Sequence, residues 1–310
     1  MPLAAAEREA PARIHARIVE AGLAEEYPFA SRFLDVDGGR MHYVDEGPRD
    51  AAPVLMLHGN PTWSFLYRRL VKALSGEHRC VAPDHIGCGL SDKPQDWRYD
   101  LVGHIENVEK LVLALDLRDL TLVVHDWGGP IGLGFARRHP ERVARVVITN
   151  TAAFPGPAPL RLRVCRAPWI GPFLVQRLNA FAGTAPTLAV QRPLSATARA
   201  GFALPYRKAA DRIAVARFVQ DIPLSPKDRS WAELAEIEAS LDGLRTRPLC
   251  ILWGERDFVF TPAFREEWQK RLPKVEVHRL EEAGHWLYED EPTQVERLIG
   301  AFVSTPRRGP

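Results

Sequence analysis

Short apolar runs alternate with longer segments of helical periodicity along most of this chain. Val54–Leu57, Thr121–Val124 and Leu249–Trp253 are runs typical of strands buried on both faces of a sheet. Residues 101–115 instead place apolar side chains at 101, 105, 108, 111, 112 and 115, the spacing of an amphipathic helix. Further strands are expected at 79–83, 143–148 and 275–278, further helices at 62–74, 131–138, 262–271 and 293–302, and a hairpin at 33–44. This alternation predicts an α/β fold with a mostly parallel sheet and helices on both faces.

The alternation stops at residue 151 and resumes near residue 241. The segment between contains ten prolines and three stretches of helical periodicity, at 160–164, 173–181 and 211–219. Because proline ends helices, short helical elements are expected there. We therefore predict an N-terminal extension with a short helix (1–30), a main domain (31–150 and 241–310) and a helical insertion (151–240).

The charge is distributed unevenly between these parts. The chain has 310 residues and a net charge of +2, but residues 151–230 hold twelve Lys/Arg and three Asp/Glu, a net +9. Such a segment suits an anionic membrane surface or acidic partner proteins, and it equally suits a solvated arginine-rich surface. Nucleic-acid binding is not expected, because the chain has no dense Lys/Arg tract.

Composition excludes several other classes of protein. An apolar fraction of 46% and a charged fraction of 26% are typical of a soluble globular protein, and no apolar run approaches the ~20 residues of a membrane span. The four cysteines form no C-x-x-C pair and no secretory signal is visible, so we expect reduced thiols and a cytoplasmic location. The histidines are scattered and no dinucleotide-binding loop is present, so neither a metal nor an organic cofactor is expected.

Three polar residues follow shortly after predicted strands. Asp126 follows the strand at 121–124, Asp257 the strand at 249–253, and His285 the strand near 275–280. In a parallel sheet all three lie at the carboxyl edge, where open α/β folds place their sites. The chain order of nucleophile, acid and histidine is that of the α/β-hydrolases.

The segment around Asp126 suits a sharp turn from a strand into a helix. Gly128 and Gly129 supply the small residues that such a turn needs, whereas Val124 stands where the G-x-S-x-G form has glycine. No serine is present, so a nucleophile here is a carboxylate. Each residue also has a simpler explanation: Asp126 as a helix cap, Asp257 as a turn residue and His285 as a loop residue. Their joint occurrence favours the catalytic interpretation.

The motifs resemble those of one known family. HGNPTWSFLYR (58–68), DHIGCGLSDKP (84–94), VHDWGGPIG (124–132), LWGERDF (252–258) and EAGHWLYED (282–290) resemble the haloalkane dehalogenases of the α/β-hydrolase superfamily, over residues 30–303. The resemblance implies an eight-stranded main domain with a helical cap inserted after the sixth strand.

The resemblance also implies a role for each site residue. Asp126 would attack a substrate carbon and become an ester, His285 would activate water against that ester, and Asp257 would orient His285. Backbone N–H groups of Asn60 and Trp127 would form the oxyanion hole. The Asn60 amide and the Trp127 indole would hold the leaving anion, although a turn residue and a core residue are the simpler interpretations.

A narrower resemblance follows from the position of the acid. No Asp or Glu lies between Arg142 and Ala210, so an acid after the sixth strand is absent and Asp257 must serve, as in the third dehalogenase subfamily. Within it, ARFVQDIPLSP (216–226), TNTAAF (149–154) and LWGERDFVFTP (252–262) look like the β-lactone decarboxylases of long-chain olefin biosynthesis. The expected reaction converts a cis-3,4-dialkyl β-lactone into a cis-alkene and CO2.

Three other functions remain open from the sequence. A haloalkane dehalogenase would use the same triad and donors. An epoxide hydrolase fits less well, because that family uses two cap tyrosines and residues 151–240 contain only Tyr206. A non-catalytic, ligand-binding hydrolase fold would be expected to lack a triad member, and none is missing.

The substrate is expected to be a small hydrophobic molecule, delivered either from an anionic membrane surface or by other enzymes of olefin synthesis. Five apolar residues of the insertion are candidates for the substrate pocket, and packing in a core explains each of them equally well. They are Trp169, Phe173, Leu178, Phe181 and Phe218.

Overall fold

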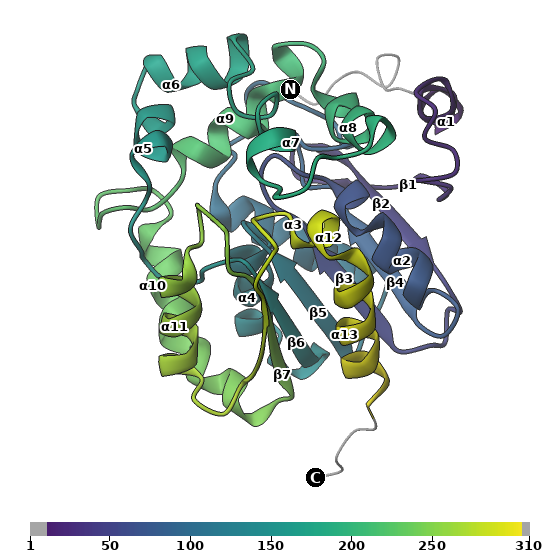
Figure 1. Ribbon diagram of the computed structural model, residues 1–310, viewed down its shortest axis with the longest axis vertical. Coiled ribbons are helices and arrows are strands. Elements are labelled where there is room, and N and C mark those ends of the chain that lie inside the picture. Colours follow the sequence, from purple (N-terminus) through teal and green to yellow (C-terminus); the bar gives the residue numbers. More distant parts are fainter. Residues whose placement is uncertain (1–10, 306–310) are drawn as a thin grey trace.

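A computed structural model describes residues 11–305. The first ten residues of the predicted N-terminal extension lie outside that range, and its short helix is α1 (Pro11–Glu20). An eight-stranded sheet forms the centre of the molecule (Figure 1). Its strands are β1 (Arg32–Val36), β2 (Gly39–Glu46), β3 (Pro53–Leu57), β4 (Arg79–Pro83), β5 (Leu120–His125), β6 (Val143–Thr149), β7 (Leu249–Gly254) and β8 (Glu276–Leu280).

The strands lie in the order β1-β2-β4-β3-β5-β6-β7-β8. Strand β2 pairs antiparallel with both β1 and β4, and all other neighbours are parallel. The predicted mostly parallel α/β sheet is therefore confirmed. Since β3, β5, β6 and β7 are parallel neighbours, the loops that follow them meet at one edge of the sheet.

Helices cover both faces of the sheet, as predicted. They are α2 (Arg68–Leu74), α3 (Leu101–Ala114), α4 (Gly128–Arg138), α10 (Trp231–Ser240), α11 (Pro262–Arg271), α12 (Leu287–Asp290) and α13 (Pro292–Ser304), with the 3₁₀ segments η2 (Ser64–Tyr67), η3 (Pro140–Arg142) and η7 (Leu241–Thr246).

Strand β3 is apolar at successive positions because its side chains enter a hydrophobic core on each face of the sheet. Leu55 and Leu57 point into the core shared with α3, α4, α10 and α11, whereas Val54 and Met56 point into the core shared with α1, α2 and α13. All four side chains are fully buried. A strand covered on both faces must be apolar at every position.

The chain between β6 and β7 is helical. Its elements are α5 (Leu160–Arg166), α6 (Ile170–Pro172), the π-helical η4 (Phe173–Arg177), α7 (Ala185–Leu188), α8 (Ala196–Ala203), η5 (Leu204–Tyr206), η6 (Ala210–Arg212) and α9 (Ile213–Gln220). They gather at one end of the molecule, and α5, α6 and η4 pack against α9 (Figure 1). Helix α10 packs instead against α4.

Several predicted helices differ in extent from the observed ones. The helix expected at 131–138 begins at Gly128, and the one expected at 211–219 begins as η6 and is α-helical only from Ile213. The helix expected at 62–74 begins as η2 and becomes α-helical only at Arg68. The helix expected at 173–181 ends at Arg177. It ends there because the Leu178 N–H donates to the Phe173 carbonyl in a widened turn and Asn179 adopts φ +55°.

Candidate active site

Asp126 lies at the sharp turn between β5 and α4. Its φ of +52° is in the left-handed region, which is uncommon for residues other than glycine and is often found at functional sites. The Asp126 N–H donates to the Asn150 carbonyl at 3.1 Å, and the Thr151 hydroxyl donates to the Asp126 carbonyl at 2.5 Å. The backbone that presents the carboxylate is therefore held by the residues that follow β6.

The glycines after Asp126 allow close packing of the turn. A Cβ on Gly128 would lie 1.9 Å from the Leu57 carbonyl oxygen, so no other residue fits there without a shift of the backbone. Val124, which stands where the G-x-S-x-G form has glycine, packs against Gly132, one helical turn after Gly128. A Cβ on Gly132 would meet Cγ1 of Val124 at 2.8 Å, so the absence of a side chain at Gly132 makes room for the larger strand residue.

The structure brings Asp126, Asp257 and His285 together, although they come from three different loops. His285 Nδ1 lies 2.8 Å from Asp257 Oδ2, and its Nε2 lies 3.8 Å from Asp126 Oδ2. All three residues are less than 9% exposed. The hydrogen bond to Asp257 fixes the orientation of the imidazole, which leaves Nε2 facing the Asp126 carboxylate.

Burial and neighbouring charges set the ionisation of this triad. Burial raises the pKa of Asp126, and the charge of His285 and the backbone N–H groups of Asn60 and Trp127 oppose that rise. Burial alone would also raise the pKa of Asp257, but His285 and donors that include the Val259 N–H lower it. Burial lowers the pKa of His285, yet the two carboxylates reverse this effect and leave it above 6.5.

Asn150 is a site residue that the sequence analysis missed. Its Nδ2 donates to Asp257 Oδ2 at 2.9 Å and to the Gly254 carbonyl at 3.1 Å, while its Oδ1 accepts from the Gly254 N–H at 2.8 Å. Asn150 directly follows β6, so the rule that selected Asp126, Asp257 and His285 would also have found it. Asn150 therefore lies after the sixth strand, where the sequence has no acid, and its amide forms a hydrogen bond with Asp257, the acid that follows β7.

Asn60 and Trp127 lie on either side of the carboxylate. The Asn60 backbone N–H donates to Asp126 Oδ1 at 2.6 Å, so this oxygen is held and Oδ2 is the one left facing His285. One N–H of the Asn60 amide donates to the Val215 carbonyl in α9 at 3.1 Å. The Trp127 indole N–H makes no hydrogen bond to any residue between 11 and 305, although both side chains line the same cavity.

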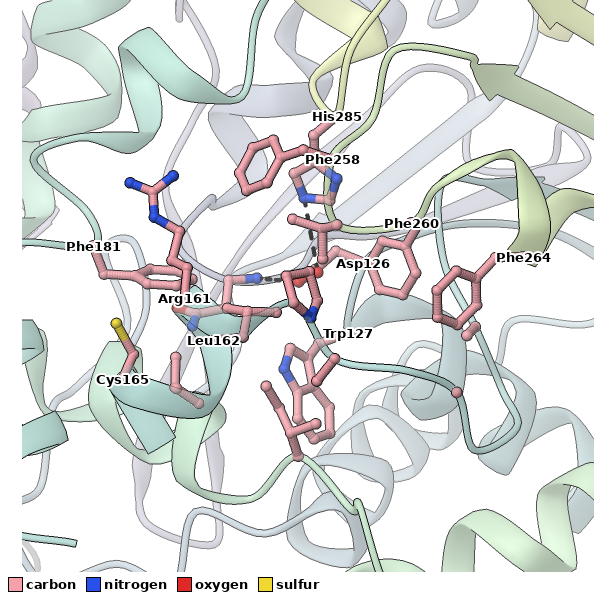
Figure 2. A pocket seen from close by; sticks show the side chains of 18 of the residues that line it. Asp126, Trp127, Arg161, Leu162, Cys165, Phe181, Phe258, Phe260, Phe264 and His285 are labelled. Atoms are coloured by element: carbon pink, nitrogen blue, oxygen red, sulfur yellow. Dashed lines mark hydrogen bonds and ion pairs between the residues drawn. The ribbon is translucent and has the colours of Figure 1, made fainter. Parts of the chain in front are cut away.

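That cavity lies between the sheet edge and the helices α5, α7 and α9, and together with the part of it that is open to solvent it has a volume of about 1260 Å³. Asn60, Asp126, Trp127 and His285 supply its main polar groups, and most of the remaining lining is apolar. Figure 2 shows Phe181, Leu162 and Cys165 on one side of Asp126, and Phe260 and Phe264 on the other. Asp126 therefore lies between two groups of apolar side chains, which we call the two arms of the cavity.

Of the five proposed pocket residues, only Phe181 lines this cavity. For the other four the expectation was wrong. Trp169, Phe173 and Leu178 are 90%, 56% and 59% exposed on the outer side of the insertion, because α9 covers only the inner side of that layer. Phe218 is fully buried behind the pocket, with its ring 5.2 Å from that of Trp127 and 4.5 Å from that of His104.

The four cysteines are buried and unpaired. Between residues 11 and 305 no cluster of His, Cys, Asp and Glu forms a candidate metal site. In the same range, no helix combines the length and the apolar character needed to cross a bilayer.

A carboxylate at a strand–helix turn, paired with a histidine and a second acid, defines a hydrolase-type site on this fold. The chain belongs to the α/β-hydrolase-fold family, whose profile matches residues 52–292. It is 45% identical over 285 residues to a cis-3-alkyl-4-alkyloxetan-2-one decarboxylase of Shewanella oneidensis, covering 89% of each chain. It is 36% identical to a haloalkane dehalogenase of Mycobacterium marinum, covering 88% of this chain and 94% of that one.

Solved structures agree with these relationships. The crystal structure of a haloalkane dehalogenase from Agrobacterium tumefaciens superposes with a TM-score of 0.80 at 28% identity, covering 88% of this chain and 96% of that one. The two resemblances inferred from the motifs, to dehalogenases and to β-lactone decarboxylases, are thereby confirmed.

Proposed function

We propose that this enzyme decarboxylates cis-3,4-dialkyl β-lactones to cis-alkenes and CO2. The reaction named for its 45% identical relative supports this assignment. The observation that carries it is the position of Asp126 between two apolar arms. A β-lactone with an alkyl chain on each of two adjacent ring carbons has its reactive ring in the middle, so each chain would occupy one arm.

The balance of the reaction is simple. The bond between the carbonyl carbon and C3 supplies the electron pair of the new double bond, the C4–O bond breaks, and CO2 leaves. Asp126 Oδ2 is placed to attack the substrate, because Oδ1 accepts the Asn60 N–H. Once Asp126 is acylated or alkylated, Oδ1 is a carbonyl oxygen, and the backbone N–H groups of Asn60 and Trp127 stabilise negative charge there.

The leaving oxygen also needs a donor. Asn60 and Trp127 both line the cavity, and the indole N–H of Trp127 and the second N–H of the Asn60 amide are uncharged donors, so they would stabilise a developing anion without binding it tightly. The lactone reaction consumes no water, so Asp126 must leave its adduct as a free carboxylate when the alkene and CO2 form. Water activated by His285, which Asp257 orients, would be needed only to cleave an alkyl ester such as the one that a haloalkane forms.

Haloalkane dehalogenation is the second candidate function. The same uncharged donor pair suits a halide leaving group, and 36% identity to a dehalogenase supports it. An epoxide hydrolase is less well supported, because Tyr206 donates to the Thr62 carbonyl and no tyrosine between residues 11 and 305 lines the cavity. A non-catalytic role is disfavoured by the assembled triad.

Delivery of the substrate forms part of the proposal. A molecule with two alkyl chains is poorly soluble, so it would reach the cavity from a membrane or from another enzyme of olefin synthesis, with the basic insertion as the receiving surface. We place this reaction in the cytoplasm, since the four cysteines are unpaired.

The decisive experiment compares substrates. Purified enzyme is incubated with a long-chain cis-β-lactone and, separately, with 1-bromobutane and 1,2-dibromoethane, and alkene, bromide and alcohol are quantified. Alkene from the lactone at a rate well above that of bromide release supports the proposal. Bromide and alcohol without alkene would establish the dehalogenase instead.

Two variants test the use of both arms. Ala185→Phe narrows the arm beside Phe181, whose carbonyl accepts the Ala185 N–H, and Ala152→Leu narrows the arm beside Phe154. Each variant should lower kcat/KM for a lactone with two long chains by ~10-fold, since excess volume in a packed site displaces the ligand. Turnover of the short 1-bromobutane should survive. Equal losses on both substrates would argue against a two-armed binding mode.

A further inference from the structure

Exposed hydrophobic side chains are concentrated on the insertion. Ten large hydrophobic side chains are exposed between residues 11 and 305, and seven of them lie at positions 160–188. They are Leu160, Val164, Trp169, Ile170, Phe173, Leu178 and Leu188. An apolar cluster of this kind on a soluble fold marks an interaction surface.

All of these side chains except Leu188, which lies on α7 and lines the cavity, belong to the outer side of one layer. Helices α5 and α6 and segment η4 pack against α9, and the buried members of that layer, Cys165 and Val175, share a small core with Val215 and Val219. On α5, Arg161, Arg163 and Val164 are exposed, whereas Leu162 and Cys165 are buried. The inner side of the layer is apolar, as expected for a side that packs against α9. The outer side carries arginines, but it also carries exposed hydrophobic side chains.

Trp169 is held outward by an unusual turn. Its φ and ψ are +70° and −52°, and the Ile170 N–H donates to the Pro168 carbonyl at 2.8 Å, which makes it the centre of a γ-turn with positive φ. That turn is rare and strained for a bulky residue. It leaves the indole 90% exposed, so the strain is linked to presentation of this side chain rather than to its burial.

The charge of the same surface is entirely positive. Residues 160–188 contain four arginines and no acidic residue. Arg166 pairs with Asp228, whereas Arg161, Arg163 and Arg177 form no ion pair with any residue of the described range, 11–305. Exposed Trp, Phe and Leu side chains interspersed with arginine are the composition of segments that lie in the interface of an anionic bilayer.

The surface also borders the catalytic cavity. Arg161 and Leu188 are exposed and line the cavity, together with Phe258, whose ring lies 5.7 Å from the Arg161 guanidinium carbon. In Figure 2 Arg161 and Phe258 lie above Phe181, on the side away from Phe264. A molecule that entered from a surface in contact with α5 would reach the arm beside Phe181 first.

We propose that the outer face of α5, α6 and η4 docks peripherally on an anionic lipid bilayer and takes the dialkyl substrate directly from it. The identity of the substrate rests on the proposed function, whereas the docking itself does not. Trp169, Ile170 and Phe173 insert among the acyl chains, and Arg161, Arg163 and Arg177 contact the lipid phosphates.

Vesicle flotation tests docking without any substrate. The full-length protein should float with vesicles of phosphatidylcholine containing 40% phosphatidylglycerol, and bind pure phosphatidylcholine at least tenfold more weakly, because each arginine near an anionic surface contributes roughly fivefold. Binding should weaken steeply between 50 and 500 mM salt, as the screening length falls below about 10 Å. Absence of flotation at low salt would overturn the proposal.

Matched variants locate the surface. Trp169→Ser with Phe173→Ser should weaken flotation by roughly tenfold or more, as should Arg161→Glu with Arg163→Glu. Val19→Ser with Leu113→Ser, which removes exposed hydrophobic side chains of α1 and α3, should leave it unchanged. If both double-serine variants lost vesicle binding equally, a specific docking face on α5, α6 and η4 would be excluded. If the wild type ignores vesicles but self-associates in sedimentation velocity, and Trp169→Ser with Phe173→Ser is monomeric, the face binds a second copy instead.

Kinetics separates this inference from the proposed function. Trp169 and Phe173 lie outside the cavity, so the Trp169→Ser, Phe173→Ser variant should turn over a short-chain soluble β-lactone at the wild-type rate. Its rate should fall only on a long-chain lactone embedded in anionic vesicles. Loss of rate on both substrates would contradict a docking role. If no lactone is turned over while flotation is retained, the proposed function fails and the docking surface stands.

Discussion

Replacing Gly59 by alanine places a methyl group where the nucleophile's carboxylate lies. A Cβ at this position would stand 2.0 Å from Asp126 Oδ1, 2.3 Å from its Cβ and 2.5 Å from its Cγ. Gly59 is not among the described glycines with positive φ, so alanine fits the backbone and the effect is a clash with one side chain. Ordinary contacts begin near 3.4 Å, so Asp126 must move by more than about 1 Å.

That displacement should abolish most of the activity. It breaks the 2.6 Å hydrogen bond from the Asn60 N–H and changes the 3.8 Å approach of His285 to Oδ2. A misplacement of about 1 Å costs ~100-fold, and loss of an oxyanion donor costs a further ~100-fold or more. Overpacking should lower the free energy of unfolding by only about 1–3 kcal/mol. Steady-state turnover and thermal unfolding of Gly59→Ala measure the two effects separately.

Two controls test whether the effect of Gly59→Ala comes from the clash with Asp126. Gly76→Ala, at a glycine with nothing within 4 Å of an added Cβ, should retain wild-type activity and stability. In an Asp126→Gly background, whose residue tolerates φ +52°, Gly59→Ala should cost almost no stability, because the clashing side chain is gone. Wild-type turnover by a folded Gly59→Ala would refute the assignment of the carboxylate to this position.

Four further outcomes are expected. His285→Gln should accumulate an Asp126 ester with 1-bromobutane, seen as one added butyl group by intact mass, provided that the wild type turns this substrate over; an unmodified variant would contradict the water-activating role. Trp127→Phe should slow turnover by ~100-fold or more with little change in Tm, and near-normal rates on every substrate would exclude the indole as a donor. Hydrolysis of the alkyl ester should slow as the pH falls through the pKa of His285, because only the neutral imidazole activates water; Asp126 is uncharged in the ester, so Asp257 alone still raises that pKa against the effect of burial, and a hydrolysis rate that is unchanged from pH 8 to pH 4 would contradict this role. Asp221→Asn should raise the free energy of unfolding by about 2–4 kcal/mol at pH 8 and not at pH 4. Burial raises the pKa of Asp221 to about 7, so stability is lost as the pH rises towards that value, and equal effects of the variant at both pH values would argue against this linkage.

The triad was predictable because it depends on the order of strands and on little else. A strand buried on both faces must be apolar throughout, so polar residues begin where it ends, and parallel neighbours bring the loops that hold these residues to one edge. Asp126, Asp257 and His285 all lie in such loops, and so does Asn150. The distance from His285 Nδ1 to Asp257 Oδ2, 2.8 Å, is then a consequence of the sheet.

The pocket residues were not predictable in the same way. Trp169, Phe173 and Leu178 are as apolar as Phe181, and short proline-bounded helices show too few turns for their periodicity to separate two faces. The contact with α9 determines which side of α5, α6 and η4 is buried. The backbone conformation at Trp169, with φ +70°, directs its side chain outward.

The sheet, the chain order of the three site residues and the expectation of a carboxylate nucleophile could all be read from the amino-acid sequence. These features follow from continuous apolar runs and the residues at their ends, which act locally. Three features depend on the tertiary structure: the Asn60 N–H binds Oδ1 of Asp126, the Asn150 amide binds Asp257, and six exposed hydrophobic side chains of the insertion lie outside the cavity. Each of those depends on contacts between segments distant in the chain, and the energy of such contacts is not encoded in any local pattern.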